Sequence, residues 1–432
     1  IDRARDILNG VFTLPDSKGG FIMETLTGEF EWSPEYAQGN TYHPPKMFRY
    51  HLNQHEPLSS LAGVYNQTKE TMYRDRIVVL MMDWIRRVPT YWELLPGNEC
   101  KRQHWQNMMS RNRFEKWLDL YPLISADLSD QDAVDLMKAM VLHARLMDEY
   151  VTKNMGSGIT GTLVGMIKVN LKFAILFPQT QMGRQAVETF RKHFRTGIDT
   201  MFYPDGGLKY CCAGYHKAVS GWYVQAVALA EELELSGMDY EREMTKQMQA
   251  YSVYLMKPDG SLPLLGDTGW GMPAGSLADW RRVMLDELRP ETPSQALAWS
   301  GAYALRSGWE PEDLYLFLNA GPHGTMHNHQ DHLSFEVSAF GKPVIVEPGI
   351  TPYGRADQRA QLISSQAHNS LTVDGDGQYR VYTEPTSPSS NPWHSSPEFD
   401  FVEGTFDEGF GPEKSINVTH IRSALFIKSE YF

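Results

Sequence analysis

The chain has 432 residues, of which 42% are hydrophobic and 12% aromatic, and its formal net charge is −13. This length predicts two domains rather than one. The acidic balance excludes a broad nucleic-acid-binding surface, because phosphate contacts need clustered Lys and Arg. No run of about 18 apolar residues occurs, so we expect no membrane span. Cys100, Cys211 and Cys212 lack zinc-ligand spacing and are predicted to be free thiols.

Up to about residue 290 the chain carries the pattern of amphipathic helices. Apolar residues recur every three or four positions in segments such as "DQDAVDLMKAMVLHARLMDEYVTKN" and "SGWYVQAVALAEELELSG". Short turns rich in Gly, Pro and Asp separate these segments, so successive helices are expected to pack as antiparallel hairpins. We therefore predict a helical domain over residues 1–290, built like a closed toroid or an α-solenoid.

The pattern changes after "RPETPSQ". Short alternating segments such as "DLYLFLNAG" and "LSFEVSAFG" are bounded by Gly, Pro or Asp, which is typical of an antiparallel sheet or sandwich. Residues 291–432 are thus predicted to form an antiparallel β-sandwich domain. The last segment, "INVTHIRSALFIKSEYF", still has a strand pattern, so we expect the sandwich to be incomplete in this chain.

The segment "HNHQDHL" at residues 327–333 concentrates histidines on a predicted loop or strand start in the β domain. On an extended segment, the rings of His327 and His329 would project to the same side. Imidazole and carboxylate together suit zinc or a similar divalent ion, and Glu347 and His368 are the obvious further donors. The residues alone leave four hypotheses open: a metal site, a proton-transfer site, both, or a polar turn between strands.

Two further polar positions lie in the helical region. Tyr215 and His216 follow a glycine-containing turn at the start of a helix, where a tyrosine is by default a half-buried packing residue. Asn154 lies where a helix breaks into glycines in "TKNMGSGITG", which is by default a helix-end position.

Together these segments resemble the heparinase II/III-like polysaccharide lyases, which include heparinase III-like and alginate lyase-like enzymes. The resemblance covers nearly the whole chain. Its most specific part is the ordered series of HxHxD, an acidic-Pro-Gly strand end, Tyr, Arg and His-Asn in "HNHQDHLSFEVSAFGKPVIVEPGITPYGRADQRAQLISSQAHNSLTVDG". The resemblance implies an incomplete (α/α) toroid followed by an antiparallel β-sandwich, with the active site in the cleft between them.

The resemblance also implies roles for particular residues. Tyr215 and His327 match the catalytic tyrosine and histidine of the family, and Asn154 matches the asparagine that engages the uronate carboxyl group. The positions that match a structural divalent metal ion, expected to be zinc, are His329, Glu347 and His368.

This chain departs from the family pattern at three places. Met155 follows Asn154 where many members have His, and Glu347 stands where Asp is more usual. The stretch "KYCCAGYH" lacks the Glu that precedes the catalytic tyrosine in many members. Contacts to substrate are therefore expected to differ from those of other members.

The implied reaction explains why these residue types are needed. β-Elimination removes the C5 proton of a uronate, which is too weakly acidic unless the neighbouring carboxylate is neutralised, and Asn154 could supply part of that. Tyr215 and His327 would be the acid and base, in an order that depends on uronate stereochemistry. Because an unperturbed tyrosine has a pKa near 10, cationic neighbours would assist it. The expected substrate-binding residues are Arg102, His216 and Trp270.

The expected substrate is an acidic polysaccharide, with a heparan-type glycosaminoglycan first and alginate second, and such an enzyme is expected to be periplasmic or secreted. A second hypothesis is a glycoside hydrolase, which needs paired carboxylates roughly 5–10 Å apart. Asp205 and Asp267 are available, but both are explained as turn residues. A third hypothesis is a non-catalytic glycan-binding protein that uses Trp92, Trp105, Trp222 and Trp270. The sequence does not determine the oligomeric state.

Overall fold

The fold is described from a computed structural model, over residues 2–15, 21–25, 32, 50–88, 107–157, 160–269, 277–350 and 356–428. The chain divides into two compact units. Unit 1 consists of Ile1–Phe194, Leu229–Glu234 and Pro352–Gly354. Unit 2 consists of Arg195–Ala228, Leu235–Thr351 and Arg355–Phe432.

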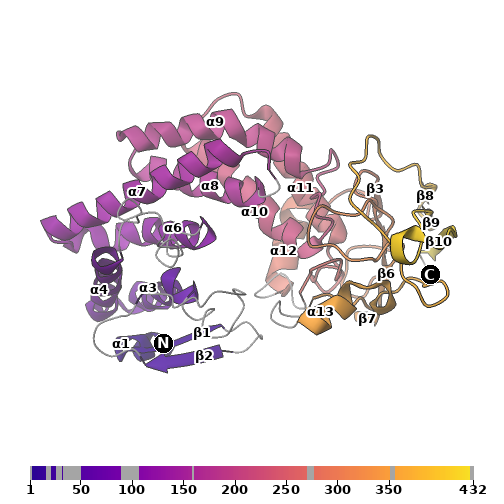
Figure 1. Cartoon of the computed structure of the whole chain (residues 1–432), viewed down its shortest axis with the longest axis horizontal. Helices are drawn as coiled ribbons and strands as arrows, with labels where there is room; N and C mark the ends of the chain where they lie inside the picture. Colours follow the sequence, from indigo (N-terminus) through magenta and orange to yellow (C-terminus); the bar gives the residue numbers. More distant parts are fainter. Residues whose placement is uncertain are drawn as a thin grey trace. The chain divides into compact units, whose positions relative to one another are not determined.

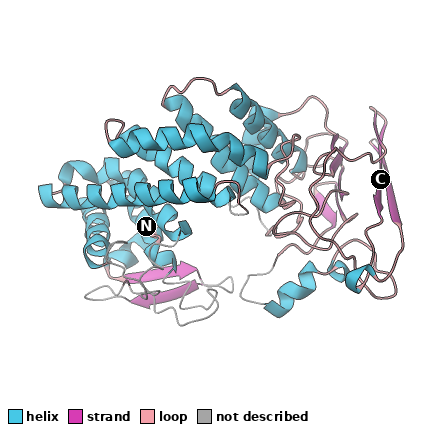
Figure 2. Cartoon of the chain, turned by 45° about the horizontal axis from the view of Figure 1, so that its top comes forward, coloured by secondary structure: helices cyan, strands magenta, loops and turns pink. Residues whose placement is uncertain are grey.

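Unit 1 is mainly helical (Figures 1 and 2). Its helix α8 is apolar on nearly all sides and is buried against α6 and α7, as expected for a central helix. Strands β1 and β2 form an antiparallel pair and lie between α1 and α3 in the sequence. The elements are α1 (Asp2–Leu8), β1 (Val11–Pro15), β2 (Phe21–Thr25), α3 (Glu56–Thr68), α4 (Thr71–Arg87), α6 (Asn107–Ile124), α7 (Asp130–Asn154), α8 (Thr160–Leu176) and α9 (Gln181–Met201), whose end belongs to unit 2.

Unit 2 combines helices with two antiparallel sheets, whose strand orders in the described residues are β3-β4-β5-β6-β7 and β10-β9-β8. Its helices are α10 (Ala213–Glu232), whose last residues belong to unit 1, α11 (Asp239–Leu255), α12 (Leu277–Leu288) and α13 (Ala356–Ile363). Its strands are β3 (Gln295–Leu297), β4 (Ala302–Arg306), β5 (Tyr315–Asn319), β6 (Phe335–Ala339), β7 (Lys342–Ile345), β8 (Trp393–Ser395), β9 (Phe399–Phe406) and β10 (His420–Ile427).

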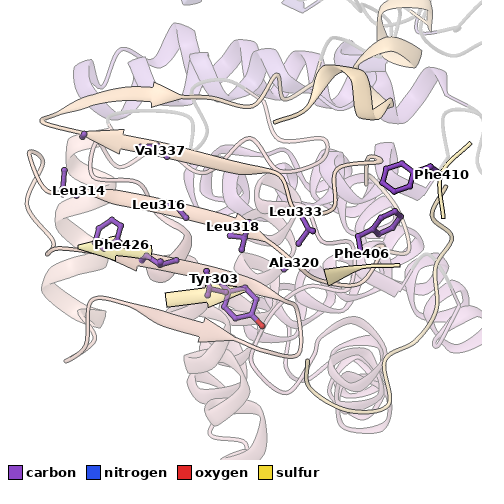
Figure 3. Close-up of a cluster of buried hydrophobic side chains, with 13 residues drawn as sticks. Tyr303, Leu314, Leu316, Leu318, Ala320, Leu333, Val337, Phe406, Phe410 and Phe426 are labelled. Carbon is purple, nitrogen blue, oxygen red and sulfur yellow. The ribbon is translucent and has the colours of Figure 1, made fainter. Parts of the chain in front are cut away.

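Both faces of the larger sheet are covered, which explains why β4 and β5 are buried at every position. On one face, Leu316 and Leu318 of β5 share a core with Phe406 of the smaller sheet (Figure 3). The alternate residues Tyr315 and Phe317 belong to a second core with α10 and α11. Unit 2 is therefore a sandwich of two sheets with a layer of helices on the outer face of the larger one.

The predicted order of helices followed by antiparallel strands is confirmed. The last helix before the larger sheet, α12, ends at Leu288, and β3 begins at Gln295. The pair β1–β2 and helix α13 depart from the predicted pattern, because segments this short carry little periodicity. The compact units divide at Phe194, so a domain boundary at residue 290 stays a prediction. No helix in the described ranges is long and apolar enough to cross a membrane.

Replacing Gly321 by Ala should destabilise the sandwich. A Cβ atom at Gly321 would lie 1.9 Å from the backbone oxygen of Ser300, which cannot move aside as a side-chain tip can. We expect the free energy of unfolding to fall by about 2–3 kcal/mol, measured by urea denaturation. The control is Gly221→Ala in α10, where no atom lies within 4 Å of the new Cβ. This control should be neutral or stabilising by up to about 1 kcal/mol. Equal losses in both variants would contradict the steric explanation.

Candidate active site

A buried carboxylate, Asp267, gathers the polar residues of unit 2. Its side chain has 0% exposure and accepts hydrogen bonds from Nδ1 of His327 at 2.8 Å and Nε2 of His329 at 3.1 Å. Arg359 of α13 donates from Nη1 to Oδ1 at 2.7 Å and from Nη2 to Oδ2 at 2.8 Å. A bidentate guanidinium is the strongest common partner of a carboxylate, so this pair anchors the cluster.

The backbone around Asp267 lies directly against the backbone of the histidine segment. The Asp267 N–H donates to the carbonyl of His327 at 2.9 Å. A Cβ atom on Gly266, whose φ is +55°, would lie 2.4 Å from that same oxygen. Only glycine permits both the positive φ and this close approach.

The histidine segment is a loop and not the extended strand from which the common direction of the two rings was predicted. His327 has a φ of +60°, in the left-handed region, and no strand covers residues 320–334. Of the two predicted placements, a loop or a strand start, the structure has the loop, so the geometry expected for an extended segment does not apply. The rings of His327 and His329 nevertheless reach the same carboxylate, because Asp267 bonds to both.

Tyr215 and His327, the two predicted catalytic side chains, are in direct contact. Their rings stack with centroids 3.7 Å apart and planes 13° apart. Tyr215 lies in the first turn of α10, and the neighbouring Gly214 N–H donates to Oγ1 of Thr268 at 2.9 Å. The ring of Tyr210 lies 5.6 Å from that of His327, and burial raises the pKa of the Tyr210 phenol, so this phenol stays protonated.

The predicted metal-binding residues also lie together. The rings of His329 and His368 are 5.2 Å apart, and Nδ1 of His329 and Nε2 of His368 are buried without a hydrogen-bond partner. Glu347 accepts from Nδ1 of His368 and, at 2.7 Å, from the N–H of Asn369. Burial lowers the pKa of His368, but the hydrogen bond to Glu347 and nearby carboxylate charges outweigh burial and raise it overall.

The nitrogens of His329 and His368 are of a type that binds divalent ions, and both are buried without a hydrogen-bond partner. Among the residues that the structure describes, however, no three His, Cys, Asp or Glu side chains are arranged to hold a metal ion. Glu347 is instead bonded to the opposite nitrogen of His368. In metal sites, a carboxylate bonded to the nitrogen that does not bind the metal orients the imidazole.

Asn154 is the last residue of α7, and its Nδ2 donates to the carbonyl of Tyr150 at 2.8 Å. Met155 then leaves the helix with an extended backbone. Asn154 belongs to unit 1, whereas Tyr215 and His327 belong to unit 2. Two other predicted residues, Arg102 and Trp270, lie outside the described residues.

His216 is buried, with 2% exposure, and both of its ring nitrogens are used within the fold. Its Nδ1 accepts from the N–H of Leu208 at 3.3 Å, and its Nε2 donates to the carbonyl of Met248 at 3.0 Å. Burial lowers the pKa of His216 to about 4, so the ring is neutral. This geometry supports a structural role for His216 and speaks against the predicted contact with substrate.

Sequence reasoning missed two residues of the cluster, Asp267 and Arg359. Asp267 lies in "GDTG", which cannot be told from other turn segments such as "YPDGG", and Arg359 was included in the resemblance without a role. No sequence signal distinguishes this aspartate from Asp205. The free-thiol prediction is confirmed for Cys211 and Cys212, whereas Cys100 lies outside the described residues.

Comparison with known proteins finds family matches over residues 21–432. Residues 21–298 match the heparinase II/III N-terminus, and residues 289–432 match the heparinase II/III-like C-terminal region. The chain belongs to the heparinase II/III family. It is 23% identical over 407 residues to the heparin-sulfate lyase of Pedobacter heparinus, covering 89% of this chain and 59% of that enzyme.

Solved structures of heparinases share the fold. The heparan sulfate lyase HepC from Pedobacter heparinus has a TM-score of 0.67 and 19% identity, covering 99% of this chain and 66% of that one. A crystal structure of heparinase III has a TM-score of 0.69 and 16% identity, covering 94% and 64%. This heparinase II/III chain therefore has the predicted toroid-plus-sandwich fold and spans about three fifths of the length of the curated relative.

Replacing His216 by Gln should flatten the dependence of stability on pH. In the unfolded chain an ordinary histidine has a pKa near 6.5, whereas the folded ring resists protonation down to about pH 4. The neutral ring therefore stabilises the fold fully above pH 6.5, and this stability is lost as the pH falls from 6.5 to 4. The shift corresponds to roughly 3 kcal/mol.

Gln can accept from Leu208 and donate to Met248 without titrating, so the variant should lose about 3 kcal/mol less than the parent between pH 7 and pH 4. Urea denaturation at both pH values measures this difference. His394→Gln, at an exposed position of β8, controls for the removal of a histidine. An unchanged pH dependence in His216→Gln would count against the structural role.

Proposed function

We propose that this chain carries the acid–base centre of a polysaccharide lyase that cleaves a uronic-acid-containing polysaccharide by β-elimination. The observation that carries the proposal is the stacking of Tyr215 on His327 at 3.7 Å, with Nδ1 of His327 held by Asp267. Similarity to a heparin-sulfate lyase supports a glycosaminoglycan of the heparan type as substrate, with alginate as the alternative. A periplasmic or secreted location is part of the proposal, because such polymers lie outside the cytoplasm.

The paired side chains can supply both proton transfers of the reaction. The Nδ1–H of His327 donates to Asp267, so the lone pair of the neutral ring is on Nε2. If neutral His327 takes the C5 proton on Nε2, the phenol of Tyr215 protonates the departing glycosidic oxygen. In the opposite order, a Tyr215 phenolate takes the C5 proton and an imidazolium His327 donates its Nε2 proton to that oxygen. Rings in contact approach a substrate from the same side, which favours elimination of a proton and leaving group that are syn to one another.

The uronate carboxylate must be neutralised for the C5 proton to be removed. The hydrogen-bond donor proposed for this is Asn154, and the support is the family resemblance. Arg102 and Trp270 remain proposed substrate contacts on the same ground. The guanidinium of Arg359 is 22% exposed and already neutralises Asp267.

We also propose that His329 and His368 hold a structural divalent ion, zinc by preference, through Nδ1 and Nε2 respectively. The support is that both nitrogens are buried without a hydrogen-bond partner. Glu347 was predicted as the third ligand, but its bond to Nδ1 of His368 supports an orienting role instead. When bound, the ion would tie the histidine loop to the segment that carries His368.

The geometry disfavours a glycoside hydrolase built on Asp205 and Asp267. A hydrolase needs two carboxylates that face the sugar. Asp267 has no exposed side-chain surface and binds two histidines and an arginine. Asp205 accepts from the N–H groups of Gly207 and Ser300, which are turn and loop contacts.

Replacing Tyr215 by Phe should reduce kcat by about 100-fold or more, because it removes one acid–base group and leaves the ring stack in place. The measurement is the ultraviolet absorbance of the C4–C5 double bond formed from heparan sulfate, with alginate tested in parallel. Tyr210→Phe is the matched control, since it removes a nearby phenol that stays protonated. The role of Tyr215 is refuted if the variant folds and keeps more than about a tenth of the parental kcat.

Replacing His329 by Ala should lower metal content and melting temperature together. A metal site couples to folding, so losing a ligand loses the stabilisation that the ion supplies. Elemental analysis and melting curves before and after chelation measure both effects, and His394→Ala is the exposed control. A parent protein without bound metal, or one whose melting is unchanged after the metal has been removed, would contradict the structural ion.

A further inference from the structure

Asp267 bonds to different nitrogens on its two histidines, Nδ1 of His327 and Nε2 of His329. A carboxylate paired with a bidentate guanidinium stays ionised and can only accept hydrogen bonds. Both ring nitrogens that face Asp267 must therefore carry a proton. In the neutral rings the lone pairs are then on Nε2 of His327 and Nδ1 of His329, so one carboxylate selects opposite tautomers.

We propose that Asp267 is a positioning residue of the active site, which fixes the tautomer and orientation of both His327 and His329. The proposal rests on the proposed lyase function, because it assigns Nε2 of His327 to proton exchange with substrate. For His329 it assigns the lone pair to Nδ1, which is the buried nitrogen without a hydrogen-bond partner. Arg359 keeps the carboxylate charged and oriented through its two hydrogen bonds.

The turn that carries Asp267 also positions Tyr215. The hydroxyl of Thr268 donates to the carbonyl of Leu265 at 2.6 Å and accepts from the N–H of Gly214 at 2.9 Å. Gly214 immediately precedes Tyr215 in the first turn of α10. One short turn therefore holds the backbone of the tyrosine and the rings of both histidines, and it fixes the spacing of the acid–base pair.

An amide in place of the carboxylate separates this role from simple packing. Asn has nearly the same shape as Asp, but it replaces one acceptor oxygen by an NH₂ group. Each oxygen of Asp267 accepts from one ring and from the guanidinium of Arg359, so the NH₂ group would face a ring N–H and a guanidinium N–H in either orientation. One of the rings must therefore change its tautomer or lose its bond. Asp267→Asn should therefore disturb the chemistry more than the fold.

The experiment compares Asp267→Asn with the parent in the complete chain. We expect kcat on heparan sulfate to fall by about 100-fold or more, as for loss of a correctly protonated acid–base group. KM should change by less than about threefold, because substrate contacts remain. Nitrogen-15 NMR of histidine-labelled parent protein should show His327 protonated on Nδ1 and His329 on Nε2, with resonances assigned from His327→Gln and His329→Gln.

The matched control is Asp205→Asn, a buried turn aspartate of the same unit whose carboxylate accepts from Gly207 at 3.0 Å and from Ser300 at 2.8 Å. It should lose stability and keep the parental kcat. A folded Asp267→Asn with a kcat within about threefold of the parent would overturn the proposal. A parental spectrum with the proton of His327 on Nε2 would also overturn it.

The spectrum is recorded on the parent protein and does not depend on Asp267→Asn, so it tests the proposal even if that variant does not fold. If the parent cleaves no uronate polymer, the proposed function fails. The NMR spectrum then still tests whether Asp267 fixes the tautomers of both rings. A failure of the proposed function is therefore distinguishable from a failure of the positioning role.

Discussion

An ionised carboxylate with no exposed surface must be surrounded by hydrogen-bond donors, because removing a charge from water is costly unless it is paired. Asp267 meets this requirement with donors from two separate parts of the chain, the histidine loop and α13. These hydrogen bonds therefore hold both segments against the Asp267 carboxylate. The position of the His327 ring, which stacks on Tyr215, follows from satisfying one buried charge.

The sandwich supplies the rigid support for this cluster. The histidine loop connects β5 to β6, two strands that are buried on both faces, and its end at Leu333 is fully buried in the core between the sheets (Figure 3). The N–H of Leu333 donates to the carbonyl of Asn319 at 2.7 Å, and Arg422 of β10 donates to its carbonyl. A loop fixed at both ends by packed strands can hold side chains as accurately as a strand can.

The proposed metal site and the proposed acid–base pair share one short loop. His327 stacks on Tyr215, and His329 lies beside His368, yet both rings bond to the same carboxylate. Asp267 is therefore a partner that the two rings share.

The sequence by itself determined the order of helices and strands, because the periodicities that distinguish them are local. Through the family motif it also identified Tyr215, His327, His329 and His368, which the structure brings together. Only the tertiary structure decided that Asp267 is the centre of the cluster and that His216 is a packed residue with both nitrogens used. The reason is that the role of a polar side chain depends on which segment, distant in sequence, contacts it, and a local sequence pattern carries no information about that contact.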